Sequence, residues 1–306
     1  MILPKNNSCA IFIYFVVLIF SGVNFYSCSV PENIEQKIIL SQKYITNDKL
    51  DSAQVILETA ITLDPSNVIL LNQLAEIHFR KLEIGKALIF YNKSVLLDST
   101  NADVHFKIAE IKLFLGDYKE VFNSINKGLR IDERKPRAYF MKGVAYKHIG
   151  DTVKAISCLK TAIEIQNNFS PVYYELGLLL TYQKDSLAID YYKNGIDLNP
   201  DDPGLLSSLA WCYEQFNKTT EANKTYYKLL TKFPNYKLGK TNYALFKLGL
   251  KELDTALVLC NEVLEMDSLD YRGLNLKGII FNERGDLKES IKIKQKLLNF
   301  DSKSDF

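Results

Sequence analysis

Histidine and cysteine are the side chains of this chain that could bind a metal or act in catalysis, and they are few. The three histidines, His78, His105 and His148, have no partner four residues away that would place two zinc ligands on one helix face. No two of the five cysteines have the two-residue spacing of zinc or redox sites. Neither a Ser-His-Asp arrangement nor a glycine-rich phosphate loop is evident. We expect a protein that is not an enzyme and uses no metal and no cofactor.

The charge balance argues against a polyanionic partner. Lysine and arginine total 38 residues and aspartate and glutamate total 36, so the formal net charge is +2 in 306 residues. A chain so nearly neutral has no global field that attracts nucleic acid, and we expect no nucleic-acid partner. A hydrophobic content of 47% is enough to form a sizeable core.

The N-terminus has the layout of a signal peptide. An apolar run over residues 10–20 is followed by small and polar residues, and it is shorter than the roughly 20 residues that a spanning helix needs. The stretch "NFYSCSV" then places Ser27 before Cys28. This resembles a bacterial lipoprotein signal, in which such a cysteine becomes the lipidated first residue. An uncleaved membrane anchor and cleavage without lipidation are the alternatives.

The resemblance implies a signal peptide over residues 1–27 and a short tether over 28–33. It also implies a cell-envelope location, with the protein anchored by lipid at Cys28 on a periplasmic or surface face. The five residues Ser29–Asn33 reach at most about 18 Å when extended, so the remainder would stay close to the membrane.

The rest of the chain is an internal repeat. Turns such as "GDYKE" at Gly116 and "GDTVK" at Gly150 recur 34 residues apart, and the chain can be aligned in eight registers from Ile34 onward. Seven spacings separate them, six of 34 residues and one of 33, and we place the missing residue in the turn Gln183–Ala188. The registers begin at Ile34, Val68, Ala102, Pro136, Ser170, Pro203, Lys237 and Tyr271.

Each register contains two helical stretches of about a dozen residues joined by a polar turn. Two positions of each register carry small side chains, as is needed where paired helices approach closely. Fifteen of these sixteen residues are small, and Val121 is the exception. The pairs are Ser41/Ala53, Ala75/Ala87, Ala109/Val121, Gly143/Ala155, Gly177/Ala188, Ala210/Ala222, Ala244/Ala256 and Gly278/Ser290.

On these residues the chain resembles tetratricopeptide repeat proteins from Ile34 to about Asp301. The resemblance implies an all-α, right-handed superhelical solenoid of about eight antiparallel helix pairs, with residues 34–306 as the array. It also implies that a protein or peptide segment binds in a concave groove lined by the first helix of each pair. Some members of the family bind a chaperone's C-terminal carboxylate with lysines and asparagines, and the corresponding positions here do not carry that set.

The candidate partner-binding residues are aromatic and apolar side chains on the first helices. They are Phe106, Phe114, Phe140, Val144, His148, Tyr174, Leu178, Tyr182 and Trp211. Two interpretations are open, because aromatic residues at these positions either pack one first helix against the next or present a docking strip to a partner.

The function that follows is an interaction scaffold, a membrane-tethered adaptor of the bacterial envelope whose groove holds a segment of another protein. The alternative is a structural protein that associates with itself by docking its C-terminal unit, through Ile293 and Leu297, against another copy.

Overall fold

The computed structural model describes residues 33–301, so the predicted signal peptide and Cys28 lie outside the described residues. These residues form sixteen α-helices and no strand. The first four helices are α2 (Ile34–Thr46), α3 (Leu50–Leu63), α4 (Val68–Arg80) and α5 (Ile84–Leu97). The next six are α6 (Ala102–Phe114), α7 (Tyr118–Leu129), α8 (Pro136–His148), α9 (Thr152–Ile165), α10 (Ser170–Tyr182) and α11 (Leu187–Leu198). The last six are α12 (Pro203–Gln215), α13 (Thr219–Lys232), α14 (Lys237–Gly249), α15 (Leu253–Met266), α16 (Tyr271–Glu283) and α17 (Leu287–Asp301).

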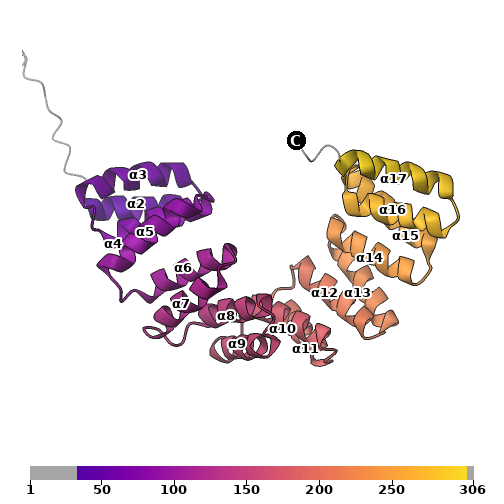
Figure 1. Cartoon of the computed structure of the whole chain (residues 1–306), viewed down its shortest axis with the longest axis horizontal. Coiled ribbons are helices and arrows are strands. Elements are labelled where there is room, and N and C mark those ends of the chain that lie inside the picture. The colour runs from indigo at the N-terminus through magenta and orange to yellow at the C-terminus, as the bar shows by residue number, and fades with distance from the viewer. Residues whose placement is uncertain (1–32, 302–306) are drawn as a thin grey trace, which may run out of the picture. The chain divides into compact units, whose positions relative to one another are not determined.

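The helices group into two compact units with their boundary between Ser99 and Thr100. The first unit contains the two helix pairs α2/α3 and α4/α5, and the second contains the six pairs from α6/α7 to α16/α17. Within the second unit, Figure 1 shows the first helices α6, α8, α10, α12 and α14 along the inner side of a curved stack and their partners outside it. The fold is therefore the predicted all-α superhelical repeat.

The predicted register is confirmed at every pair. All eight first helices begin at the residues that the spacing indicates, from Ile34 in α2 to Tyr271 in α16. Local chemistry explains these starts. The side chain of Asn67 accepts hydrogen bonds from the backbone N–H groups of Ile69 and Leu70, which caps α4. Proline stands in the first turn of α8, α10 and α12, where a missing N–H costs little.

The recurring turn ends each first helix in the same way. In the third pair the N–H of Gly116 donates to Leu113 O at 3.1 Å, and the N–H of Asp117 donates to Lys112 O at 2.9 Å. This is a Schellman motif, which requires a positive φ at its central residue. Gly116 has φ 71°, whereas Leu82 occupies the same position of the second pair with φ 61°. Glycine is thus favoured in this turn, but other residues adopt the same backbone at a cost.

The shortened turn lies where the spacing places it. Lys184, with φ 58°, is the central turn residue of the fifth pair and follows Gly150 by the full period. Ala188, the small residue of α11, comes one position early. The missing residue therefore falls between Lys184 and Ala188. The second helix begins later to accommodate it, at Leu187.

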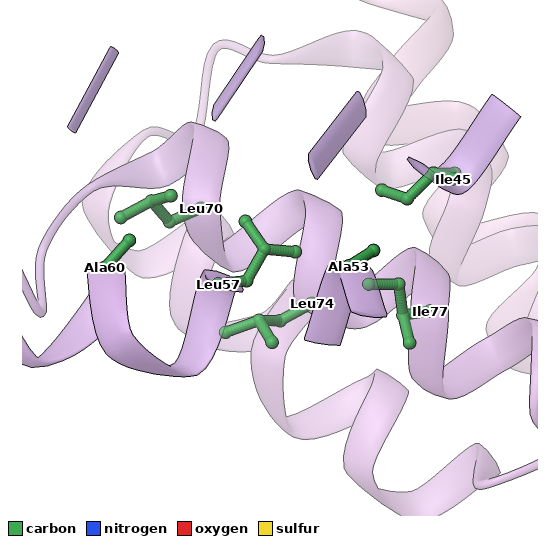
Figure 2. Packing of buried hydrophobic residues seen from close by; sticks show 7 residues of the cluster. All are labelled: Ile45, Ala53, Leu57, Ala60, Leu70, Leu74 and Ile77. Carbon is green, nitrogen blue, oxygen red and sulfur yellow. The ribbon is translucent and has the colours of Figure 1, made fainter. Parts of the chain in front are cut away.

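The small side chains lie where the paired helices meet. Every one of the sixteen residues is buried, including Val121. A Cβ atom added to Gly177 would lie 2.8 Å from the ring of Tyr192 on α11, and one added to Gly143 would lie 2.7 Å from Leu159 on α9. Larger side chains fill the space between pairs. Figure 2 shows this packing in the first unit, where the core cluster consists of Ile45, Ala53, Leu57, Ala60, Leu70, Leu74 and Ile77.

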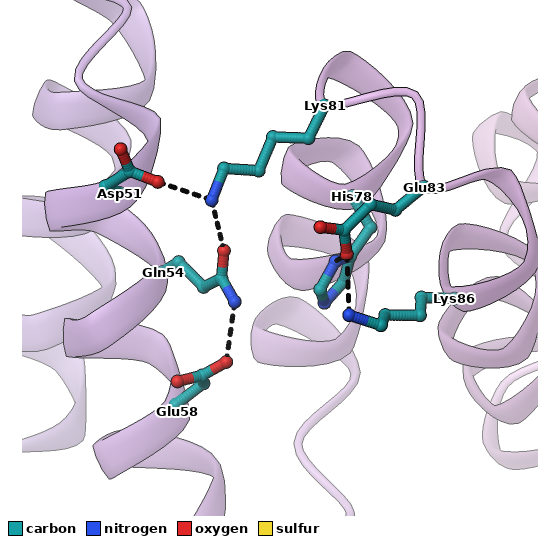
Figure 3. Close-up of polar contacts among 7 residues, drawn as sticks. All are labelled: Asp51, Gln54, Glu58, His78, Lys81, Glu83 and Lys86. Atoms are coloured by element: carbon teal, nitrogen blue, oxygen red, sulfur yellow. Dashed lines mark hydrogen bonds and ion pairs between the residues drawn. The ribbon is translucent and has the colours of Figure 1, made fainter.

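Polar contacts join the same helices at the surface of the first unit. The ammonium of Lys81, just after α4, lies 2.5 Å from Asp51 and donates to Gln54 at 2.7 Å, so it links α4 to α3 (Figure 3). Glu83 lies 2.8 Å from Nδ1 of the buried His78. Both contacts join neighbouring helices of the repeat, and an exposed ion pair such as Lys81–Asp51 adds little stability.

Candidate functional site

The candidate site is a groove along the first helices of the second unit. Three pockets follow one another there, with volumes of about 390, 260 and 220 Å³. The first lies between α10 and α12 and is bounded by Phe140 of α8. The second lies among α10, α12 and α14, and the third lies between α14 and α16. Each interval between first helices from α10 to α16 thus has a pocket, and we call this row the groove.

The middle pocket is the most aromatic part of the groove. Tyr174, Tyr182, Trp211 and Tyr236 line it together with Leu178. The rings of Tyr182 and Trp211 meet edge to face, with their centroids 5.5 Å apart. Such an arrangement fixes the orientation of both rings. The remaining lining side chains are small or uncharged, namely Gly204, Ser207, Ser208, Leu238 and Asn242.

A line of apolar side chains runs through the groove at one repeat position. Successive first helices place Leu178, Trp211, Leu245 and Ile279 there. Leu245 is 51% exposed and Ile279 is 41% exposed, and both line the third pocket. Leu178 and Trp211 are half-buried. A partly exposed apolar line along four successive first helices is typical of surfaces that bind a partner.

Five of the predicted partner-binding residues line the groove. Phe140 and Tyr174 lie in the first pocket, and Tyr174, Leu178, Tyr182 and Trp211 lie in the second. Packing also holds them, since the ring of Phe140 meets Phe169 edge to face at 5.3 Å. The two interpretations are therefore not exclusive at these positions.

Phe106 has to be corrected, because it is only 4% exposed and belongs to the core. Its ring covers Gly128 of α7, where an added Cβ atom would lie 2.4 Å from the ring. It packs in one cluster with Ala138 of α8. A side chain held in this way presents no surface to a partner, so Phe106 is not a docking residue.

The other three predicted residues lie outside the linings of these three pockets. Val144 is half-buried on α8. His148 is exposed at the end of α8 and stacks on Tyr118, with ring centroids 5.5 Å apart. Phe114 is 65% exposed at the end of α6.

Sequence reasoning missed the C-terminal half of the groove. Tyr236, Leu238, Asn242, Leu245 and Ile279 line the second and third pockets. The signal for two of them was available. Adding one period to Trp211 gives Leu245, and a second period gives Ile279.

Charge is nearly absent from the centre of the groove. The lining of the second pocket contains no aspartate, glutamate, lysine or arginine. In the first pocket, Glu175 pairs with Lys147 at 2.8 Å, and Asp202 accepts the N–H of Gly204 at 2.7 Å as the cap of α12. Arg272 is exposed in the third pocket. The groove is therefore not expected to attract a ligand by long-range electrostatics.

One half-buried carboxyl, that of Glu214, lies on α12 next to α13. Tyr226 of α13 donates its hydroxyl hydrogen to Glu214 of α12. Burial raises the pKa of Glu214 above its usual value, and the hydrogen bond from Tyr226 opposes part of that rise. Burial also raises the pKa of the Tyr226 hydroxyl, so it remains protonated and keeps donating. This pair fastens α12 to α13 and supports the wall of the groove.

Few of the described side chains are arranged for metal binding or thiol chemistry. Among residues 33–301, no three His, Cys, Asp or Glu side chains converge as metal ligands would. Cys158, Cys212 and Cys260 are free thiols, and burial raises the pKa of Cys260 to about 12. Within the same range, no helix combines the length and the apolar character needed to cross a bilayer.

Two segments match family models of the tetratricopeptide repeat, residues 136–169 and 207–236. Among curated proteins, an Hsp70-Hsp90 organizing protein of Triticum aestivum is 23% identical over 107 residues, which are 35% of this chain and 18% of that protein. A small glutamine-rich tetratricopeptide repeat-containing protein 2 of Mycosarcoma maydis is 25% identical over 108 residues, which are 35% of this chain and 31% of that protein. The chain thus spans less than a third of the length of either relative.

Solved structures agree over much more of the chain. PilF of Pseudomonas aeruginosa has a TM-score of 0.62 at 19% identity and covers 71% of this chain and 97% of its own. A tetratricopeptide repeat protein of Parabacteroides merdae has a TM-score of 0.63 at 19% identity and covers 81% and 98%. PilW, a type IV pilus biogenesis factor, has a TM-score of 0.62 at 19% identity and covers 66% and 94%. The chain therefore carries tetratricopeptide repeats, stacked as the all-α superhelical fold in which such repeats mediate contacts between proteins.

Proposed function

We propose that the second unit is a non-enzymatic adaptor that holds a segment of a partner protein in the groove. The observation that carries this proposal is the row of three pockets, the second and third of which are joined by the line Leu178, Trp211, Leu245 and Ile279. Tryptophan and tyrosine supply large contact areas at a small entropic cost and are frequent at binding hot spots. Trp211 is the only tryptophan of the chain, and it lies in the middle pocket.

Replacing three groove residues tests this function. The variant Tyr174→Ala, Tyr182→Ala, Trp211→Ala removes aromatic surface from the middle pocket and leaves the small residues between paired helices intact. A matched control replaces three exposed residues of second helices, Val153, Tyr227 and Val258, by alanine. Crosslinking in cells, with circular dichroism to check folding, should show partners lost from the first variant and retained by the control. An identical set of partners for both would defeat the assignment of the groove.

We further propose that the protein is tethered to the bacterial cell envelope by lipid at Cys28. The support is the apolar run followed by "NFYSCSV" in the sequence. An envelope location would also suit the likeness in fold to PilW, a type IV pilus biogenesis factor. Metabolic labelling with an alkyne fatty acid tests the tether. We expect label on the wild type and none on Cys28→Ala, and an unlabelled wild type would contradict the proposal.

Self-association through the last pair receives less support from packing. Lys294 of α17 is exposed, and its counterparts in the other second helices are all buried. They are Leu57, Tyr91, Ile125, Leu159, Tyr192, Tyr226 and Cys260. A helix of another copy that continued the stack at α17 would cover the Lys294 ammonium, which is costly without a partner charge. Light scattering should therefore show a monomer.

A further inference from the structure

The middle pocket has unused hydrogen-bond donors. The hydroxyl groups of Tyr174, Tyr182 and Tyr236 and the indole N–H of Trp211 have no hydrogen-bond partner among the described residues. Three other tyrosines of the second unit, Tyr173, Tyr226 and Tyr243, instead donate to a partner within the chain. Tyr173 donates to Asn167 O at 2.6 Å and Tyr243 donates to Asn223 at 2.7 Å.

The donors belong to aromatic side chains in a pocket whose own lining carries no charged side chain. The lining of the middle pocket contains four aromatic residues and no acidic or basic side chain. A ligand that matches this lining offers flat apolar groups that stack on rings and bare carbonyl oxygens that accept from tyrosine and tryptophan. It needs neither net charge nor many N–H groups of its own.

The spacing of the groove adds a constraint on the ligand. The pockets occupy successive intervals between neighbouring first helices, and packed helices lie about 8–10 Å apart. A polyproline II helix has three residues per turn and a rise of about 3.1 Å per residue, so every third residue faces the same side at about 9 Å. One side chain per interval can therefore enter the row of pockets without distortion of the ligand.

We propose that the groove binds a proline-rich segment in the polyproline II conformation, with rings stacked on Tyr182 and Trp211 and carbonyls facing the free hydroxyl groups. This inference rests on the proposed use of the groove for partner binding. Proline lacks an N–H, and polyproline II carbonyls have no internal partner, so the ligand supplies acceptors where the groove supplies donors. An α-helical ligand satisfies its carbonyls internally, and an extended strand turns alternate side chains away from the groove.

The single tryptophan gives a direct reporter of this interaction. A poly-L-proline peptide of about twelve residues, four turns of the helix, is titrated into the protein while the fluorescence of Trp211 is recorded. We expect a saturable change that is insensitive to salt, because the lining is uncharged. A glycine-serine peptide of equal length, which is flexible and lacks rings, should give no saturable change.

Replacing tyrosine by phenylalanine tests the hydrogen bonds of the hydroxyl groups without removing the rings on which folding depends. The variant Tyr174→Phe, Tyr182→Phe, Tyr236→Phe keeps every ring and should bind poly-L-proline at least about tenfold more weakly. The control Tyr118→Phe, Tyr139→Phe, Tyr227→Phe removes three hydroxyls outside the middle pocket and should bind like the wild type. Equal binding by both variants would overturn the role of the free donors.

A third probe distinguishes failure of this inference from failure of the proposed function. An amphipathic helical peptide with leucine anchors is titrated in the same way. If it changes Trp211 fluorescence while poly-L-proline does not, the groove still binds partners and the polyproline inference is wrong. If neither peptide binds, the polyproline inference is also wrong, and the crosslinking comparison alone decides whether the groove is a docking surface.

Discussion

The third and fourth helix pairs place a phenylalanine at the same repeat position with different outcomes. Phe106 is buried, whereas Phe140 is half-buried and lines the first pocket. Gly128 of α7 leaves space that the Phe106 ring fills, while its counterpart in α9 is Ala162, whose methyl group occupies that space. The missing side chain at Gly128 thus lets the Phe106 ring join the core. A glycine is not sufficient by itself, because Gly195 holds the same position of the fifth pair, where Leu205 and Tyr173 lie against it and Tyr174 lines the groove.

The largest expected effect comes from truncating Phe106. Phe106→Ala should lower the free energy of unfolding by about 3 kcal/mol, because it opens a cavity in a packed cluster. Tyr174→Ala should cost about 1 kcal/mol, because its side chain is only half-buried. Denaturant unfolding should show the larger loss of stability for Phe106→Ala. A binding assay should show loss of partner binding only for Tyr174→Ala. Loss of binding by a folded Phe106→Ala variant would return that residue to the docking surface.

A methyl group at Gly128 should make the packing around Phe106 in the third pair more like the packing around Phe140 in the fourth. Gly128→Ala places a Cβ atom 2.4 Å from the present Phe106 ring, so we expect the ring to move and stability to fall by about 2 kcal/mol. Gly249→Ala is the matched control, since nothing lies within 4 Å of an added Cβ atom there. That control should gain up to about 1 kcal/mol from helix propensity. Equal melting behaviour of both variants would contradict the packing explanation.

The turns after the first helices share one backbone conformation, although their central residues differ. Leu82 occupies with φ 61° the position that Gly116 holds with φ 71°. Leu82→Gly should raise stability by about 0.5 kcal/mol, since the left-handed strain removed exceeds the entropy that glycine adds. Gly116→Ala should lower it by about 1 kcal/mol. Thermal melts of the two variants that shift in the same direction would show that the turns differ.

The smallest expected effect is a pH dependence of stability caused by Glu214. Glu214 of α12 stands where α6 has Leu113, and burial raises its pKa above the unfolded value. Its ionisation therefore costs stability as pH rises from the unfolded pKa through the folded pKa. Relative to Glu214→Gln, the wild type should become more stable when the pH falls from neutral to about 4. A stability difference that does not change with pH would contradict the burial of this carboxyl.

The sequence predicts the framework of this protein far better than its surface. The helix starts and the small residues between paired helices follow a strict period, because every pair must solve the same packing problem. The exposure of an aromatic ring is not periodic in this way. The burial of Phe106 depends on Gly128, which lies on another helix. The contact between these two residues is seen only once the two helices are packed together. The missed residues Leu245 and Ile279 were within reach, since they continue the position of Trp211.

The groove, and not the outer face, should contact a partner. A photoreactive amino acid placed at Ser208 in the middle pocket, and separately at the exposed Ser157 of α9, tests this most directly. Irradiation in cells should link a partner to the protein from position 208 and not from position 157. Linkage from position 157 alone would contradict a docking role for the groove.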